Sequence, residues 1–253
     1  MSLRTSSSRR SVLLWRILVG LIFVLVAFTL DDAVQATVQP TLNNRSAETL
    51  ADGWEKSVAH ALSHYGDWPY LLLAGGVALG ITFLLRRYRA SRIVALILAA
   101  GMLTGFTCTI IRSMVGRTRP LSHHPQGFYG PWFDSHWIVG KYEFGAFPSG
   151  HTATAMGLAA AIWLFNRRLG VLCGLVAVAI AWSRIVLGCH HFSDVVAATV
   201  WAFIVAPVLV LLLDPWSGRL WRKWFGHWER SHSEPEVSPM SPPIMASEKM
   251  RLS

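Results

Sequence analysis

Charged residues are scarce in this chain. Asp, Glu, Lys and Arg make up 15% of its 253 residues, whereas 53% of the residues are hydrophobic. A soluble domain normally has about a quarter of its residues charged. This scarcity excludes an ordinary soluble globular protein and predicts an integral membrane protein.

Cysteine is rare as well. Cys108, Cys173 and Cys189 lie in or at the end of apolar runs, and they show no CxxC spacing. A disulfide framework needs paired cysteines, and a zinc site needs closely spaced ligands. We therefore expect neither kind of site and interpret these cysteines as small core residues.

Acidic residues are the minority charge. The chain has 14 of them against 23 Lys and Arg, so its net charge is +9. The basic residues form short clusters beside apolar runs instead of a continuous face for nucleic acid. We interpret the basicity as a signal of membrane topology and expect no nucleic-acid partner.

Long apolar runs, in contrast, are abundant. A membrane-crossing helix needs about 20 apolar residues, or fewer if one end is surrounded by protein. The fourth run is short, which predicts that its beginning is recessed inside a helix bundle. The six runs are Val12 to Leu30, Pro69 to Leu85, Ile93 to Ile111, Thr152 to Phe165, Leu169 to Leu187 and Val195 to Leu213. We predict an all-α, polytopic bundle of six transmembrane helices.

The basic clusters predict the orientation of this bundle, because they fall on alternate sides of successive spans and such clusters face the cytoplasm. Both termini are then cytoplasmic. We predict an N-terminal segment 1–11, a membrane domain 12–213 and a basic, aromatic and then disordered tail 214–253. The clusters are Arg4, Arg9 and Arg10; Arg86, Arg87, Arg89 and Arg92; Arg167 and Arg168; and Arg219, Arg222 and Lys223.

The first apolar run has a second interpretation. Arg9 and Arg10 precede it, and Val34-Gln35-Ala36 follows it, as in a signal peptide with a small-residue cleavage site. The run is longer than a usual signal core, so we favour a retained span. Cleavage would leave the orientation of the other spans unchanged.

Two external segments are amphipathic or aromatic. Leu50, Trp54, Val58 and Leu62 recur at four-residue spacing, which predicts a helix lying on the membrane surface or packed on the bundle. The external loop 121–147 is dense in aromatic residues, as is typical of the membrane–water boundary. We expect this loop to frame an entrance for lipid.

The first polar cluster ends the third span. Arg112 and Arg119 are seven residues apart, so on a continuing helix they would project from one face. Pro120 discourages helix at the preceding residue. Two guanidinium groups aimed at one point can clamp a phosphoryl group, although arginines beside a span are commonly interface anchors.

The second cluster, Pro148-Ser149-Gly150-His151, directly precedes the fourth span. Serine is a favoured helix N-cap, and glycine lets a ligand approach the free N–H groups of the first turn, where the helix dipole favours an anion. His151 would stand beside this anion site, able to exchange a proton. A capped helix with an incidental histidine remains the alternative.

The third cluster joins spans five and six. Ser183 and Arg184 end the fifth span, and His190 and Asp194 lie four residues apart at the start of the sixth. A carboxylate that holds one imidazole N–H leaves the other nitrogen with a lone pair for nucleophilic attack. An ionisable pair at the edge of a span predicts function, because it is costly to keep there. A purely structural pair is the alternative.

All three clusters map to the external ends of spans three to six, which we predict as the active site. They resemble the signatures of the type 2 phosphatidic acid phosphatase superfamily, namely K-x6-R-P, P-S-G-H and S-R-x5-H-x3-D. The first reads Arg112-x6-Arg119-Pro120 here, so arginine replaces the usual lysine. The resemblance covers about residues 93–213 closely.

The resemblance implies a mechanism that fits the residues. His190 attacks phosphorus to form a phosphohistidine, Asp194 orients His190, and His151 protonates the leaving oxygen and later activates water. No metal and no other cofactor is then expected, since positive side chains and a helix start hold the phosphoryl oxygens. These phosphate-binding residues are Arg112, Arg119, Ser149, Gly150 and Arg184.

The resemblance also implies lipid substrates, such as phosphatidic acid, phosphatidylglycerol phosphate, undecaprenyl pyrophosphate or lipid A phosphates. We expect a bacterial-type enzyme of the inner membrane whose site faces the periplasm. Three alternatives stay open: a phosphatase of soluble phosphorylated metabolites, a vanadate-dependent haloperoxidase-like enzyme, and a non-enzymatic binding or transport protein. The sequence does not predict the oligomeric state.

Overall fold

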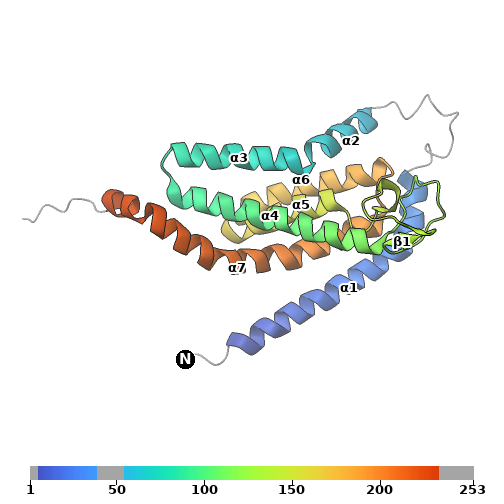
Figure 1. Cartoon of the computed structure of the whole chain (residues 1–253), viewed down its shortest axis with the longest axis horizontal. Helices are drawn as coiled ribbons and strands as arrows, with labels where there is room; N and C mark the ends of the chain where they lie inside the picture. Colours follow the sequence, from blue (N-terminus) through green and yellow to red (C-terminus); the bar gives the residue numbers. More distant parts are fainter. Residues whose placement is uncertain (1–4, 39–53, 234–253) are drawn as a thin grey trace, which may run out of the picture.

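The computed structural model of the protein describes residues 5–38 and 54–233, which are mostly helical (Figure 1), so the predicted helical class is confirmed. The helices are α1 (Thr5–Val38), α2 (Trp54–Tyr65), α3 (Trp68–Leu84), α4 (Tyr88–Val115), α5 (Gly150–Phe165), α6 (Arg167–Val186) and α7 (Phe192–Ser233). The loop between α4 and α5 contains a short antiparallel pair, β1 (Trp132–Phe133) and β2 (His136–Trp137), and the 3-10 turn η1 (Tyr142–Phe144).

Helix α5 forms the centre of the bundle. It packs against α4, α6 and α7, and more lightly against α3. Nine of its sixteen residues are buried, five of them alanines. The shortest apolar helix is therefore enclosed by longer ones, which gives its first turn protein neighbours where a lipid-facing helix would have solvent or headgroups.

Small residues allow α4 and α5 to approach each other closely. A Cβ atom added at Gly105 would lie 2.0 Å from the hydroxyl oxygen of Thr154, and one added at Gly157 would lie 2.9 Å from the Cβ of Thr104. Neither position has room for a side chain. Close contact through small residues is the usual way in which helices pack inside membranes.

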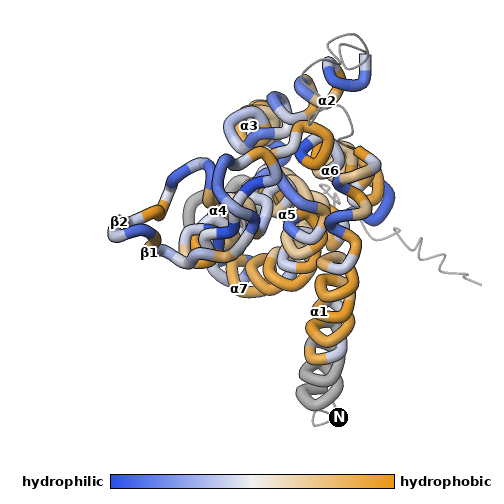
Figure 2. The backbone as a smooth tube through the Cα atoms, turned by 90° about the vertical axis from the view of Figure 1, so that its right-hand side faces the viewer, coloured by the Kyte–Doolittle hydropathy of each residue, from blue (hydrophilic) through white to orange (hydrophobic). Residues whose placement is uncertain are grey.

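The outer helices carry the apolar surface of a membrane protein (Figure 2). Among the described residues, four helical segments are long and apolar enough to cross a bilayer: Ile17–Val38, Tyr88–Val115, Arg167–Val186 and Phe192–Leu220. Helices α2 and α3 together make a fifth candidate, bent by 61°. Helix α5, with 16 residues, is shorter than the spanning length. The protein is thus an integral membrane protein with four or five apolar spans by this criterion, and the predicted sixth depends on α5.

The segment 54–65 is helical, as its four-residue spacing predicts, whereas Leu50 lies outside the described residues. Helix α2 packs against α6 and buries Ala59 and Ser63. At the other end of the chain, α7 continues through Asp214 to Ser233, so no helix end marks the predicted start of the tail. Most of the predicted disordered segment, from Glu234 onward, lies outside the described residues.

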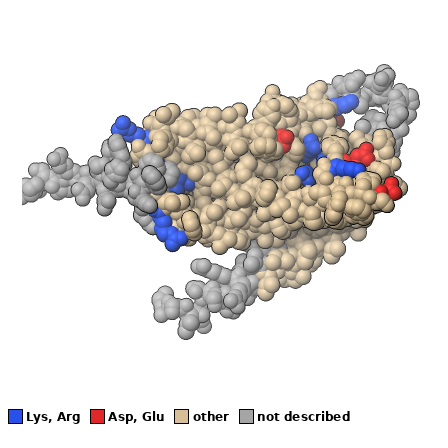
Figure 3. Space-filling model, viewed as in Figure 1, with Lys and Arg blue, Asp and Glu red and all other residues tan. Residues whose placement is uncertain are grey.

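On the face shown in Figure 3, the basic side chains lie toward the two ends of the bundle, and few charged side chains lie between them. The turns between α3 and α4 and between α5 and α6 lie at one end, and the loop between α4 and α5 lies at the other. This division agrees with alternate basic clusters along the chain. Which end faces the cytoplasm stays a prediction.

Candidate active site

Helix α4 ends earlier than the Arg112 and Arg119 spacing suggests. Gly116 adopts a left-handed conformation, with φ +60°, and a Cβ there would lie 2.0 Å from the carbonyl oxygen of Gly130. The chain turns at this glycine, so Arg112 lies in the last turn of α4 and Arg119 lies in the loop that follows. The expectation that one helical face carries both arginines is wrong, because Gly116 rather than Pro120 ends the helix.

Tertiary contacts hold Arg119 in place. Its Nε atom donates to the carbonyl of Tyr142 at 2.7 Å, and its guanidinium lies 3.7 Å from the centre of the Tyr142 ring. The residue is buried, and its NH1 atom has no hydrogen-bond partner. A fixed guanidinium with an unsatisfied buried donor is suited to an anionic ligand.

Arg184, at the end of α6, shows the same pattern. Its NH1 atom donates a short hydrogen bond to the hydroxyl of Ser63 on α2, and its Nε atom is buried without a partner. Unsatisfied buried donors are rare in folded proteins. The two such side-chain atoms found in the described part of the chain both belong to arginines of the predicted phosphate site.

The start of α5 lies beside these arginines. Ser149 occupies the N-cap position, as predicted, although its hydroxyl accepts a hydrogen bond from Thr152 instead of capping a backbone N–H. The backbone N–H of Ser149 donates to the carbonyl of Asp194 at 3.2 Å, which ties α5 to α7. A Cβ at Gly150 would lie 3.2 Å from NH1 of Arg112, so glycine lets this arginine reach the helix start.

His190 lies in the turn between α6 and α7 and is 1% exposed. Its Nδ1 atom is 2.7 Å from the carbonyl oxygen of Ala146. Because a carbonyl can only accept, Nδ1 carries the proton and Nε2 keeps its lone pair. Burial lowers the pKa of His190 well below its ordinary value of 6.5, and the charges of Arg119, Arg184 and Arg112 lower it further.

The structure differs from expectation in the partner of His190. Asp194 Oδ2 lies 3.7 Å from His190 Nδ1, beyond hydrogen-bonding distance, and accepts instead from the backbone N–H of His191 at 2.7 Å. The other oxygen of Asp194 pairs with Arg117 at 2.5 Å. The carboxylate is close enough to act on the imidazole by its charge, while the carbonyl of Ala146 takes the hydrogen bond.

Arg117 and Asp31 form a buried network that the motifs do not contain. Arg117 NH2 lies 2.8 Å from Asp31 Oδ2 on α1, and Arg117 lies between Asp31 and Asp194. Asp31 also accepts from the backbone N–H and the hydroxyl of Ser193, so α1 supplies a cap for the start of α7. An acidic residue at the end of an apolar run was the sequence signal for this contact.

His151, the second residue of α5, faces the same centre. It interacts electrostatically with Arg184, His190 and Arg112. Its Nε2 atom lies 3.3 Å from Oδ1 of Asp67, which precedes α3. The structure thus brings all eight predicted site residues to one end of the bundle, and it adds Asp31, Asp67 and Arg117. Among the described residues, no three His, Cys, Asp or Glu side chains are grouped as metal ligands.

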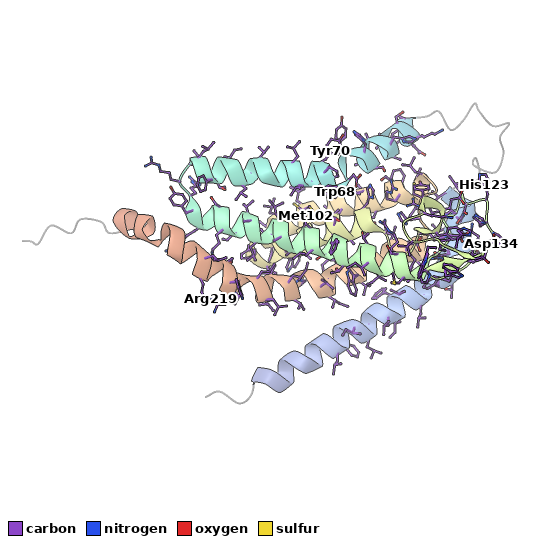
Figure 4. The ribbon with its side chains drawn as sticks, viewed as in Figure 1. Trp68, Tyr70, Met102, His123, Asp134 and Arg219 are labelled. Carbon is purple, nitrogen blue, oxygen red and sulfur yellow. The ribbon has the colours of Figure 1, made fainter. Side chains whose placement is uncertain are left out.

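Two cavities meet at Arg112. A cavity of about 530 Å³ lies between α3, α4 and α5 and reaches from Arg112 and His151 to Met102, three helical turns toward the middle of α4. Trp68 on α3 also lines it (Figure 4). A smaller cavity of about 220 Å³ adjoins Arg112 and Arg119 on the side of the loop between α4 and α5, where Lys141 lines it. An apolar cavity and a polar cavity therefore flank the arginines.

Comparison with known proteins gives the following matches. The family model of the PAP2 superfamily matches residues 90–217. Lipid A 1-phosphatase from Rhizobium etli is 30% identical over 107 residues, 42% of this chain and 44% of that protein. Lipid A 1-phosphatase from Rhizobium johnstonii is 31% identical over 94 residues, 37% of each. The chain matches less than half the length of these curated relatives.

A solved structure shares the fold. The first transmembrane PAP2 type phosphatidylglycerolphosphate phosphatase from Bacillus subtilis superposes with a TM-score of 0.54 at 18% sequence identity. The superposition covers 82% of this chain and 96% of that protein. At this identity, the likeness is one of fold.

Proposed function

Because the chain belongs to the PAP2 superfamily, we propose that it is a phosphoric ester hydrolase that removes phosphate from membrane lipids through a phosphohistidine on His190. One observation carries this proposal. A buried, neutral imidazole lies among three arginines, and two of these arginines have buried nitrogen atoms without partners. Such a centre binds a phosphoryl group next to a nucleophile.

The attack on phosphorus uses the nitrogen that the structure leaves free. With Nδ1–H donated to Ala146, the lone pair of His190 Nε2 forms the N–P bond. Arg112, Arg119 and Arg184 neutralise the non-bridging oxygens, with the N–H groups at Gly150 on the same anion. Asp194, 3.7 Å from Nδ1, stabilises the positive charge that the imidazole gains.

His151 acts as the general acid. It gives a proton to the leaving oxygen as the P–O bond breaks, and it then takes a proton from the water that attacks the phosphohistidine. That second attack releases inorganic phosphate and restores His190 to its neutral form. The guanidinium groups supply the positive charge that metal ions supply in many phosphoryl-transfer enzymes, so we propose that the reaction needs no metal.

The large cavity supports a lipid substrate over a soluble one. It begins at Arg112 and His151 and continues past Leu72, Met102 and Phe106. The hydrocarbon chain of a lipid would be shielded from water in this part of the cavity, while the phosphate of the lipid stays at the arginines. The relatives named above act on lipid A and phosphatidylglycerol phosphate. We propose that the substrate is a lipid of this class that carries a monophosphate or diphosphate ester.

The distribution of charges supports a proposal for the placement in the cell. The turns that carry the exposed Arg86, Arg87, Arg89, Arg167 and Arg168 lie at the end opposite the site (Figure 1). If they face the cytoplasm, the site faces the exterior or periplasm of a bacterial inner membrane and both termini are cytoplasmic. Membrane lipids then surround the protein and also supply its substrate. We propose no nucleic-acid partner.

The test is phosphate release by the purified full chain in detergent. Phosphatidic acid, phosphatidylglycerol phosphate, undecaprenyl pyrophosphate and lipid A are compared for wild type, His190→Ala and His151→Ala. We expect release from at least one lipid and none above background for His190→Ala. A ³²P-labelled substrate should leave acid-labile, alkali-stable label on wild type. Label that persists in His190→Ala would refute the assigned nucleophile.

A further inference from the structure

Asp67 is the acidic contact of His151. The two side chains are 3.3 Å apart, although they are 84 positions apart in the chain, and Asp67 lies outside the three motifs. The other charged or titratable groups that act on His151 are Arg184 from α6, Arg112 from α4 and His190. The arginines disfavour an imidazolium, whereas the carboxylate favours it.

The bend between α2 and α3 holds this carboxylate in position. Asp67 is the N-cap of α3, and its Oδ1 atom accepts from the N–H of Trp68 at 2.8 Å. A Cβ at the preceding Gly66 would lie 2.7 Å from Ile180, so glycine lets the bend lie directly against α6. Capping and close packing together hold Asp67 at the bend between α2 and α3, which is seen in Figure 1.

The same bend contacts a second site residue. Ser63, one turn before Asp67, accepts the hydrogen bond from Arg184. Ser63 is buried and Asp67 is partly buried, with 39% of its side chain exposed. Two contacts from one short segment reach the assigned acid and one phosphate-binding arginine. The end of α2 and the start of α3 therefore belong to the active site.

We propose that Asp67 is the positioning residue of the general acid His151, an inference that rests on the proposed function. Its carboxylate holds the proton on Nε2 and stabilises the imidazolium, as in any His–Asp pair. The proton on Nδ1 is then the one that moves to the leaving oxygen when the P–O bond breaks and the N–P bond forms at His190. In the second step, neutral Nδ1 accepts a proton from water as the water oxygen attacks phosphorus and the N–P bond breaks.

Asp67→Asn tests this role with little structural change. Asparagine is as good an N-cap as aspartate, so α3 keeps its cap while His151 loses the charge. Two substrates with equally long chains are compared: an alkyl phosphate, whose alkoxide leaving group needs a proton, and a p-nitrophenyl phosphate bearing the same chain, whose leaving group needs little protonation. Asp134→Asn, in the external loop, is the control for removal of one negative charge.

We expect Asp67→Asn to lower the single-turnover rate of phosphoenzyme formation from the alkyl phosphate by about tenfold or more, a part of the roughly 10²–10⁴-fold that a general acid contributes. The same rate from the aryl phosphate should change less than about twofold, and Asp67→Glu should restore part of the rate from the alkyl phosphate. An equal loss on both substrates, or no loss on either, would overturn the inference. A His190→Ala variant that keeps its activity would instead contradict the proposed function, whatever the result for Asp67→Asn.

Discussion

At the end of the bundle where α3 turns into α4, arginines lie in exposed turns, and Arg92 pairs with a half-exposed Asp214. At the other end, Arg117, Arg119 and Arg184 are buried to more than nine-tenths. Both ends carry arginines, but only the buried arginines have lost most of their contact with water. An exposed arginine needs no partner, whereas a buried one needs a counter-charge or a ligand. Burial, rather than charge, therefore distinguishes the arginines at the proposed active site from those in the exposed turns.

The largest effect should follow from removing the nucleophile. His190→Ala should reduce phosphate release by roughly 10⁴-fold or more, because it removes the nitrogen that forms the covalent intermediate in the proposed reaction. Initial rates of lipid phosphate hydrolysis measure this loss. A matched change of an exposed histidine, His136→Ala, should leave the rates unchanged.

Arg119→Lys should have the next largest effect. Lysine keeps the charge but loses the planar donor that faces the phosphoryl group, and the loss of one oxyanion donor costs about 10²–10³-fold in kcat. At the opposite end, Arg92→Lys should change kcat by less than about twofold. Similar losses at both ends would contradict the comparison between them.

Asp31→Asn should act mainly on stability. It removes one of two carboxylates from buried Arg117, and breaking a buried ion pair costs about 3–5 kcal/mol. Asp214→Asn at the exposed pair should cost less than about 1 kcal/mol. Thermal unfolding in detergent measures both, and an Asp31→Asn protein as stable as wild type would show that Arg117 needs only Asp194.

The pH dependence should reflect the buried state of His190. Its pKa lies well below 6.5 in the folded protein, so the neutral nucleophile persists as the pH falls through 6.5. The unfolded chain binds this proton near pH 6.5, so the folded state loses stability below that pH. Because only the neutral imidazole attacks phosphorus, single-turnover rates of phosphoenzyme formation should decline with acid only below pH 6.5. A midpoint at or above 6.5 would contradict the assignment of a buried, neutral His190.

The smallest effect should come from chelators. Because guanidinium groups supply the positive charge, excess EDTA should leave the rate of phosphate release unchanged within about twofold. Loss of activity in EDTA and its return with Mg²⁺ would show that the buried arginines do not suffice.

Much of the architecture could be predicted from the sequence, because hydrophobic runs and basic clusters are local signals. The helical class, the membrane character and the helix at 54–65 followed from such signals. The end of α4 was missed, since the left-handed turn at Gly116 depends on a contact with Gly130. The partner of His190 was missed for a similar reason: the carbonyl of Ala146 carries no sequence signal, as every residue has one.

The membrane character, the PAP2 superfamily and the motif residues can all be identified from the amino-acid sequence, because composition and short motifs are properties of neighbouring residues. The contacts of Asp31, Asp67 and Arg117 with the motif residues depend on the tertiary structure. These side chains come from α1, from the bend before α3 and from the loop after α4, and the packing of these segments brings each one to a partner that is distant in the sequence.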